Sequence, residues 1–335
     1  PLYKEYGSSF VEQLDGEYAI CLIDSDYIYV YADIFATKPL FYNIDSHIEI
    51  GSYPSMFSVS TPTQVPPGSY LSINRRTLNV VIHRYHRFNL NETIDSFEPV
   101  LEAFDFAVSK RLSTHRPAFF GLSSGYDSGS LMQSIINSNF HVPGYTVVTE
   151  DEDSDIISSR EDILYKHGID TIKCKFPSTS SIVLSRQKLK LLAEDFVMNE
   201  SENGSLMSDV ESSIGHYLLI STARKHNRTV YISGHGADEI LCNYTKNFNF
   251  KKFPWKHFYG AKQREYLLQL EYISGACGVE TRYPMLDRNF VQSFLSLHLH
   301  LKTKSYKQIF DHYLTHHQIP FIPNFKTGMG GRFIL

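Results

Sequence analysis

The chain has 335 residues and lacks several features that would assign it to a class at once. It has only four cysteines, widely spaced and without a C-x-x-C pair, which argues against both a disulfide framework and a zinc cluster. No run of lysine and arginine is long enough for a nucleic-acid track, and the net charge is -4. No stretch approaches about 18 consecutive apolar residues, and the N-terminus PLYKEYGSSF has no apolar signal core. We therefore expect a soluble, cytoplasmic protein with no nucleic-acid and no membrane partner.

The material for a large core is present. Hydrophobic residues make up 42% of the chain, aromatic residues make up 14%, and the length is enough for two domains. Up to residue 85 the pattern predicts antiparallel sheet, with strands over 16–24, 26–33, 38–44 and 71–73 and a short hairpin near Val80. The polar stretch after residue 85 is typical of a linker. Cys21, inside the first strand, is expected to be a small core residue.

Beyond the linker the pattern alternates between helices and strands. Helices are predicted over 99–113, 130–136 and 155–167, and strands over 118–122, 144–149, 171–176 and 229–233. From about residue 255 the chain reads as mostly helical. This alternation predicts an α/β fold with an open parallel sheet. The acidic segment 150–155 is expected to be a mobile loop rather than a metal site.

The stretch FFGLSSGYDSGS, residues 119–130, allows two interpretations. Gly121 to Gly125 fits G-x-S-x-G, the nucleophile elbow of α/β-hydrolases, which would make Ser123 a nucleophile. The longer string from Ser123 to Ser128 fits a phosphate-binding loop instead. Small residues let backbone N–H groups approach an anion, and the following helix adds the partial positive charge of its N-terminus. Asp127 is then explained as a ligand of Mg²⁺ on the phosphate oxygens.

A second loop follows the same plan. Strand 229–233 leads into Ser233-Gly-His-Gly-Ala-Asp238-Glu239, which again combines glycines with acidic side chains. Parallel strands place both loops at the carboxyl edge of one sheet, where ligands of open α/β folds bind. The sequence has no G-x-x-x-x-G-K-[ST], so a Walker-type site is not expected. Two aspartates sharing Mg²⁺ would form a nucleotide site, although either loop alone could be structural.

With these motifs the chain resembles the asparagine synthetase (glutamine-hydrolysing) family, class II glutamine amidotransferases with a PP-loop ATP pyrophosphatase domain. SSGYDS (123–128) matches S-G-G-x-D-S, SGHGADE (233–239) matches S-G-E-G-x-D-E, and GVETRYPMLD (278–287) matches a long and specific family segment. Residues 14–42 resemble the later part of the glutaminase domain. SYKQIF (305–310) and FKTGMGG (325–331) resemble the family's K-x-I-L-R and R-K-x-G-F stretches.

The resemblance implies three regions along the chain. Residues 1–85 would form the antiparallel β part of an incomplete Ntn-type glutaminase domain, 86–98 a linker, and 99–335 the ATP-dependent synthetase domain. The last region would carry an open parallel sheet with helices on both faces, of the adenine nucleotide hydrolase-like type. The chain would be N-terminally incomplete and divergent, because it starts at Pro1, whereas class II enzymes use an N-terminal cysteine as nucleophile.

The resemblance also implies a reaction and a set of residues. ATP adenylates a substrate carboxylate (aspartate in a true asparagine synthetase), pyrophosphate leaves, and ammonia made from glutamine displaces AMP to give an amide. ATP and Mg²⁺ are the expected cofactors. The sequence does not decide whether the chain forms a homodimer. The implied catalytic residues are Lys307, Asp127, Asp238 and His235, with Asp127 and Asp238 as metal ligands. The implied ATP and pyrophosphate contacts are Leu122, Ser123, Ser124, Gly125, Tyr126, Ser128, Val148, Ser233 and Gly234. Glu239, Glu280 and Arg282 would lie on the substrate side, and Asp33 would be a remnant of glutamine binding.

Some of these residues have a plainer alternative. Lys307 could be a solvated lysine on an amphipathic helix, and Glu280 and Arg282 could form a buried ion pair that supports the fold. His312 and His316 have a metal-ligand spacing on a helix, but no third ligand is near in sequence, so a solvated helix face is favoured.

Several positions depart from the family pattern. Ser124 stands where the family has glycine and is expected to be the weak point of the first loop, because serine tolerates positive φ less well. His235 replaces a glutamate, which puts aspartate as substrate in doubt. Ala32 and Asp311 replace arginines, and LCNY (241–244) replaces F-G-G-Y. The alternatives are a paralogue that activates another carboxylate, in natural-product, peptide-cyclising or polysaccharide chemistry, and a non-catalytic nucleotide-binding relative.

Overall fold

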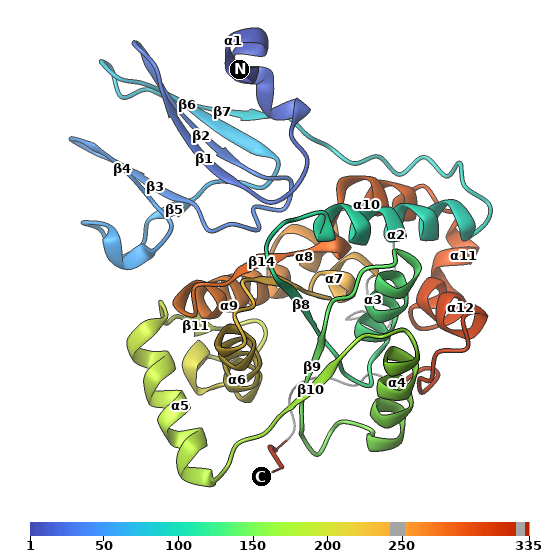
Figure 1. Ribbon diagram of the computed structural model, residues 1–335. Helices are drawn as coiled ribbons and strands as arrows, with labels where there is room; N and C mark the ends of the chain where they lie inside the picture. The colour runs from blue at the N-terminus through green and yellow to red at the C-terminus, as the bar shows by residue number, and fades with distance from the viewer. Residues whose placement is uncertain (242–251, 326–331, 335) are drawn as a thin grey trace. The chain divides into compact units, whose positions relative to one another are not determined.

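The computed structural model describes residues 1–241, 252–325 and 332–334. The chain divides into two compact units, Pro1–Asn89 and Leu90–Leu335. Figure 1 shows both. In the part of the chain that the structure describes, no helix is both long and apolar enough to cross a membrane.

The first unit is built from two antiparallel sheets. One has the strand order β1-β2-β6-β7 and the other β4-β3-β5. The strands are β1 (Ala19–Ile23), β2 (Tyr27–Ala32), β3 (Phe41–Ile44), β4 (Ile48–Gly51), β5 (Thr63–Gln64), β6 (Ser69–Asn74) and β7 (Val80–Arg84). Antiparallel sheet was predicted for this region, and the structure confirms it.

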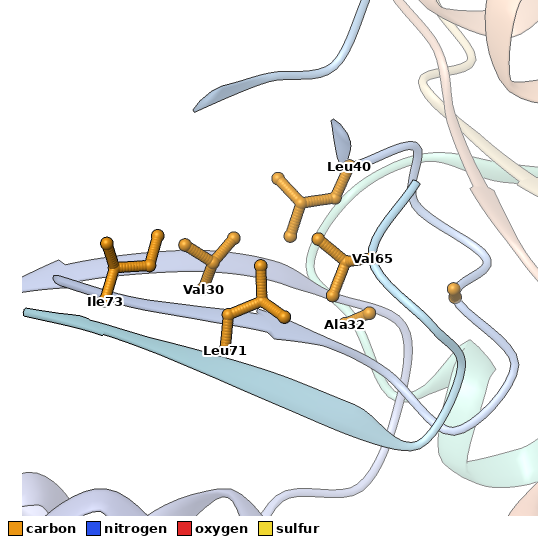
Figure 2. Packing of buried hydrophobic residues seen from close by; sticks show 7 residues of the cluster. Val30, Ala32, Leu40, Val65, Leu71 and Ile73 are labelled. Atoms are coloured by element: carbon orange, nitrogen blue, oxygen red, sulfur yellow. The ribbon is translucent and has the colours of Figure 1, made fainter. Parts of the chain in front are cut away.

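Alternation along the strands divides the core of this unit between the two faces of the larger sheet. On one face Val30 and Leu71 belong to a buried cluster with Leu40 and Val65, drawn in Figure 2. On the other face Tyr31 packs with Tyr70, and both join Phe10 of the N-terminal segment. The central strands β2 and β6 of the larger sheet are therefore covered on both faces.

The N-terminal segment itself differs from the prediction of strands throughout residues 1–85. It forms α1 (Leu2–Tyr6) and a 3-10 helix, Gly7–Gln13. Phe10 places its ring 5.0 Å from that of Tyr31, so the segment is held by tertiary packing rather than by a periodic pattern. The prediction of a buried Cys21 is wrong: its strand is correct, but β1 is an edge strand and the thiol lies on its exposed side.

The second unit contains one five-stranded sheet in the order β10-β9-β8-β13-β14, and all its pairs are parallel. Its strands are β8 (Ala118–Gly121), β9 (Gly144–Val147), β10 (Thr171–Cys174), β13 (Val230–Ile232) and β14 (Glu280–Arg282). A separate small hairpin pairs β11 (Val197–Met198) with β12 (Ser205–Leu206). The predicted open parallel sheet is confirmed.

Helices cover both sides of this sheet, as Figure 1 shows. α2, α3, α10 and α12 pack together in one group, and α5, α6 and α9 pack in another. The helices are α2 (Glu98–Leu112), α3 (Tyr126–Asn137), α4 (Ser154–Lys166), α5 (Thr179–Leu192), α6 (Glu211–Lys225), α7 (Ala237–Leu241), α8 (Lys256–Tyr259), α9 (Lys262–Ala276), α10 (Arg288–Leu295), α11 (Leu299–Thr303) and α12 (Gln308–His316). The strand β14, inside a region predicted as mostly helical, was not expected. It is only three residues long and is defined by its pairing with β13.

Candidate active site

The two predicted loops lie next to each other at the carboxyl edge of the parallel sheet. They follow β8 and β13, which are neighbouring strands with Phe120 paired to Ile232. A Cβ atom at Gly234 would lie 3.3 Å from the Cβ of Asp127, so the loops approach closely at this point. The expectation that both loops share one edge is therefore met by the strand order and the register.

Lys307 joins the two loops. Its ammonium nitrogen lies 2.5 Å from a carboxylate oxygen of Asp127 and 2.7 Å from one of Asp238. The lysine is 6% exposed and directly precedes α12, in a left-handed conformation with φ of 43°. The alternative of a solvated lysine is wrong. Backbone strain of this kind is common where a side chain must be held for function.

The charges around Lys307 keep it protonated. Burial by itself would lower its pKa, but Asp127 and Asp238 outweigh burial and raise the pKa above its ordinary value. The ring of Tyr306 also lies under the ammonium group, 5.8 Å from the nitrogen to the centroid. At neutral pH the centre of the site therefore holds one buried cation between two carboxylates.

A polar pocket of about 50 Å³ opens at this point. Both loops and the segment before α12 contribute to its wall. The lining residues are Ser123, Gly125, Tyr126, Asp127, Ser128, Asp238, Tyr306, Lys307 and Phe325. The structure thus brings together seven of the residues that the sequence singled out: five of the first loop, Asp238 of the second, and Lys307.

The first loop enters α3 earlier than predicted. The helix begins at Tyr126 with Gly125 as its N-cap, so Asp127 lies in the first helical turn, where the backbone N–H groups have no partner within the helix. The hydroxyl of Ser123 is 2.7 Å from that of Ser128. Within the described residues no histidine is hydrogen-bonded to Ser123. The geometry therefore favours a loop that binds an anion over a serine nucleophile with its base.

Ser124 has a different role from the one expected. Its φ is not positive, so the serine causes no backbone strain at the glycine position. Its backbone N–H and its hydroxyl both donate to one carboxylate oxygen of Glu152, at 2.6 and 2.7 Å. Asp153, next in the chain, accepts from two backbone N–H groups and caps α4. The acidic segment predicted as a mobile loop is thus tied to the first loop and to a helix end.

The start of the second loop, at Ser233 and His235, is held by uncharged groups. The Ser233 hydroxyl lies 2.9 Å from the Nδ1 atom of His235, whose ring is 5.1 Å from that of His216 on α6. Burial lowers the pKa of His235 to about 4 and that of His216 to about 3. Both rings are therefore neutral at pH 7, where a glutamate at position 235 would place a carboxylate.

Asp311, which replaces an arginine of the family pattern, contacts the first loop. It accepts a hydrogen bond from the Tyr126 hydroxyl at 3.1 Å. The same hydroxyl accepts from the backbone N–H of Asn324. The aspartate therefore helps to fix the first turn of α3 from the side of α12.

The other predicted residues lie outside the pocket wall. Leu122 and Val148 follow the ends of the adjacent strands β8 and β9, and Glu239 is buried in α7. Glu280 and Arg282 form an ion pair of 2.7 Å, but the Glu280 side chain is half exposed, so the pair is not the buried one considered above. Arg282 also donates to the backbone carbonyl of Arg111.

Asp33 belongs to the first unit, and its carboxylate accepts several hydrogen bonds from the turn in which it lies. It is 2% exposed and accepts from the Thr37 hydroxyl at 2.6 Å and from the backbone N–H groups of Phe35 and Thr37. Burial raises its pKa despite these donors. These contacts give the carboxylate a structural role in the turn.

Asp287, the last residue of the motif GVETRYPMLD, is a structural centre that the sequence analysis missed as such. Its side chain is fully buried, pairs with Arg111 at 2.8 Å and also with Lys110, and caps α10. Burial alone would raise its pKa, but Arg111 and Lys110 hold the pKa below its ordinary value. No local pattern identifies these partners, because they lie on α2.

His312 and His316 stack on the exposed side of α12, with ring centroids 6.3 Å apart. Among the described residues, no group of three His, Cys, Asp or Glu side chains could hold a metal ion by itself. The positions 242–244 of LCNY and 326–331 of FKTGMGG lie outside the described residues.

The donors of the pocket nevertheless fit a magnesium ion bound together with phosphate. Asp127 and Asp238 come from different loops, yet both reach the same cation, the ammonium group of Lys307. Mg²⁺ is usually held by one or two carboxylates plus phosphate oxygens rather than by a complete protein cage. Two convergent carboxylates beside the loop that leads into the N-terminus of α3 match that donor set.

Fold and site together define an open-sheet α/β protein with two acidic, glycine-bearing loops at the carboxyl edge. A family model for asparagine synthase matches residues 99–272, more than half of the chain. The chain belongs to the asparagine synthase family.

Two relatives named asparagine synthetase share about a quarter of their aligned residues with this chain. The asparagine synthetase [glutamine-hydrolyzing] of Cricetulus griseus is 27% identical over 343 residues, which is 87% of this chain and 58% of the relative. The enzyme of the same name from Homo sapiens is 26% identical over the same shares. This chain thus spans less than two thirds of the length of these relatives. An NH3-dependent NAD synthetase from Campylobacter jejuni is similar with a TM-score of 0.30 and 18% identity, covering 67% of this chain and 83% of that one. A likeness at this level identifies neither activity nor ligand.

Proposed function

We propose that the unit Leu90–Leu335 is an ATP-dependent amide-forming ligase. The observation that carries the proposal is that Asp127 and Asp238, from two strand-to-helix loops, both pair with the buried Lys307. In the family to which the chain belongs, the relatives cited above are named asparagine synthetases. The reaction class proposed is activation of a carboxylate by ATP, followed by attack of nitrogen.

The first loop binds the pyrophosphate part of ATP. Its hydroxyl groups, at Ser123 and Ser128, and the backbone N–H groups in the first turn of α3 are donors, and the helix dipole adds partial positive charge. Leu122 and Val148, which follow β8 and β9, contact the nucleoside part of ATP. Ser233 and Gly234 contact ATP from the second loop. A small binding pocket that is mostly polar fits phosphate better than an apolar ligand.

Magnesium, when bound with ATP, neutralises phosphate charge and makes pyrophosphate a better leaving group. Asp127 and Asp238 are the residues that would hold it. Lys307 is released from these carboxylates toward the α-phosphate, where negative charge develops as a substrate carboxylate oxygen attacks phosphorus and the bond to pyrophosphate breaks. A buried, preorganised cation is effective there because water does not screen it.

In the second step nitrogen attacks the activated carbonyl carbon, and AMP leaves with the carboxylate oxygen. The amide product retains the nitrogen after loss of a proton. We propose ammonia or glutamine as the nitrogen source and assign residues 1–85 to a glutaminase-like β domain, 86–98 to a linker and 99–335 to the synthetase domain. The saturated contacts of Asp33 favour a structural role over glutamine binding in the first unit.

A carboxylate other than aspartate is the second candidate substrate. The observation that favours it is the neutral pair His235 and His216 at the second loop. A neutral imidazole cannot form the ion pair that a glutamate offers to a substrate ammonium group. A substrate with an uncharged group at this position is therefore favoured, and we propose Glu239, Glu280 and Arg282 for further contacts on the substrate side.

Isotope exchange between ATP and labelled pyrophosphate tests the proposal. The full chain with MgCl₂ should catalyse exchange only when a suitable carboxylate is present, and a panel including aspartate identifies it. Asp127→Ala should abolish exchange, whereas Asp162→Ala, an exposed change on α4, should not. If the whole panel stays silent and calorimetry detects no ATP binding, the proposal is wrong.

A further inference from the structure

Arg160 lies beneath the first loop and ties three segments together. It belongs to α4, and its side chain is completely buried. Its Nη1 atom donates to the backbone carbonyls of Ser123 and Gly125, at 2.5 and 2.9 Å. Its Nε and Nη2 atoms donate to the carbonyl of Pro320, at 3.0 and 2.7 Å. A single guanidinium group therefore links the first loop, α4 and the segment that follows α12.

The partners of Arg160 are unusual for a buried charge. Buried guanidinium groups normally pair with carboxylates, because an uncompensated charge in the interior is costly. Among the described residues, none forms an ion pair with Arg160; its hydrogen bonds go to three carbonyls and to the Ser128 hydroxyl. Burial lowers the pKa of Arg160 to about 10, while Glu152 acts in the opposite direction, so the group is cationic at pH 7.

The carbonyl contacts determine how the first loop faces the pocket. In a trans peptide the C=O and N–H groups point in opposite directions. Because Arg160 holds the carbonyls of Ser123 and Gly125, the lone pairs of these oxygens are kept away from the pocket. An anion needs N–H donors, not carbonyl oxygens. The peptide of Gly125 meets this need, because its N–H, that of Tyr126, begins α3, whereas the N–H opposite the Ser123 carbonyl, that of Ser124, donates to Glu152.

Gly129 on α3 gives independent evidence that the structure makes room for this group. A Cβ atom at Gly129 would lie 2.5 Å from Nη2 and 2.7 Å from Cζ of Arg160. Glycine within a helix is unfavourable compared with alanine, so its presence in the first turns of α3 needs a reason. The reason is the close approach of the guanidinium plane to the helix backbone.

We propose that Arg160 is a positioning residue of the pyrophosphate loop: it holds the loop carbonyls away from the pocket and adds a buried positive charge behind the bound anion. The inference rests on the proposed function, because it assumes that the pocket receives pyrophosphate. It adds a residue that touches neither the pocket nor the nucleotide.

Binding of inorganic pyrophosphate to the full chain, measured by calorimetry in MgCl₂, tests this role. Arg160→Met should weaken binding by a hundredfold or more, and Arg160→Lys by about tenfold, because lysine keeps the charge but cannot bridge the carbonyls. Gly129→Ala should weaken binding although Arg160 is still present, because the methyl group displaces the guanidinium. Lys166→Met, an exposed change on the same helix, is the matched control and should bind as the wild type does.

Chemical rescue separates positioning from mere structural support. Guanidinium ion at low millimolar concentration should restore pyrophosphate binding to Arg160→Ala, whereas potassium at the same ionic strength should not. Folded Arg160 variants that bind pyrophosphate like the wild type would overturn the proposal, and so would a loss of binding that only follows the unfolded fraction. If Arg160→Met does not fold, Arg160→Lys and Gly129→Ala decide the matter. Failure of the wild type itself to bind pyrophosphate would instead remove the proposed function, and this inference with it.

Discussion

The loop at 122–128 and the loop at 233–239 each join a parallel strand to a helix, and each carries an aspartate that reaches Lys307. Their surroundings differ. Charged side chains hold the first loop, with Arg160 on its carbonyls and Glu152 on Ser124. Beyond the shared contact with Lys307, neutral groups hold the start of the second loop, where the Ser233 hydroxyl contacts Nδ1 of His235. The same local sequence plan therefore occurs in two electrostatic environments, and changes of charge or pH should affect the loops differently.

Among the changes that we propose, substitution of Asp287, which supports the region of the second loop, should have the largest effect on stability. The 3-10 turn Pro284–Leu286, just before it, packs on α7, the helix after the second loop. Asp287→Ala removes the buried carboxylate that pairs with Arg111 and Lys110 and should lower the free energy of unfolding by about 3–5 kcal/mol. Urea denaturation measures this, with Asp162→Ala as an exposed control. A change of less than about 1 kcal/mol would show that the ion pair does not support the unit.

The link between the loops is tested at Lys307. Lys307→Ala removes the cation that both aspartates share, and kcat should fall roughly 10²–10³-fold. Lys304→Ala, an exposed lysine three residues earlier, should leave kcat unchanged. Kinetics of the exchange reaction measure both variants. Retention of most activity without Lys307 would mean that the loops do not depend on a common cation.

Acid should destabilise the second loop through His216. Its folded pKa is about 3, below the ordinary histidine value of about 6.5. Between these two pH values the unfolded chain binds more protons than the folded chain. The contribution of the neutral His216 ring to the free energy of unfolding is therefore fully present above pH 6.5. It falls as the pH drops through this window, by up to about 1.4 kcal/mol per pH unit. His216→Phe should reduce this dependence in urea denaturation at pH 7 and 5.5.

The exposed His167→Gln serves as the control for that measurement and should keep the wild-type pH dependence. An unchanged pH slope in His216→Phe would show that the ring is not the group that responds to acid.

The smallest expected effect is a difference in ATP affinity between two serine variants, one in each loop. Ser124→Ala removes one hydrogen bond to the carboxyl group of Glu152, whereas Ser233→Ala removes one to the neutral His235. Ser124→Ala keeps the backbone N–H bond to Glu152 but loses the hydroxyl bond, so the first loop should be held less firmly and ATP affinity should fall a few-fold, about 0.5–1.5 kcal/mol in binding free energy. Ser233→Ala should lower ATP affinity less, because the bond that it removes inside the protein is to a neutral ring. Calorimetry distinguishes the two, and equal effects would mean that the environments do not differ in charge as described.

Local pattern predicted much of the fold. Strand-to-helix loops at 123–128 and 233–239 are recognisable because the small residues and the aspartate are contiguous, and parallel strands then put both loops at one edge. Short elements were harder: β14 has three residues and exists through pairing with β13. The N-terminal 3-10 helix depends on contacts such as that of Phe10 with Tyr31, which no periodic sequence pattern predicts.

The sequence by itself determined the α/β class, the two loops and the candidate set that includes Asp127, Asp238 and Lys307, because each motif is a short contiguous string. Only the tertiary structure decided which side chains meet. Lys307 lies 180 positions from Asp127, Arg160 lies 37 from Ser123, and Arg111 lies 176 from Asp287. Contacts over such separations depend on how sheet and helices pack, and packing placed one cation between the loops and another beneath the first.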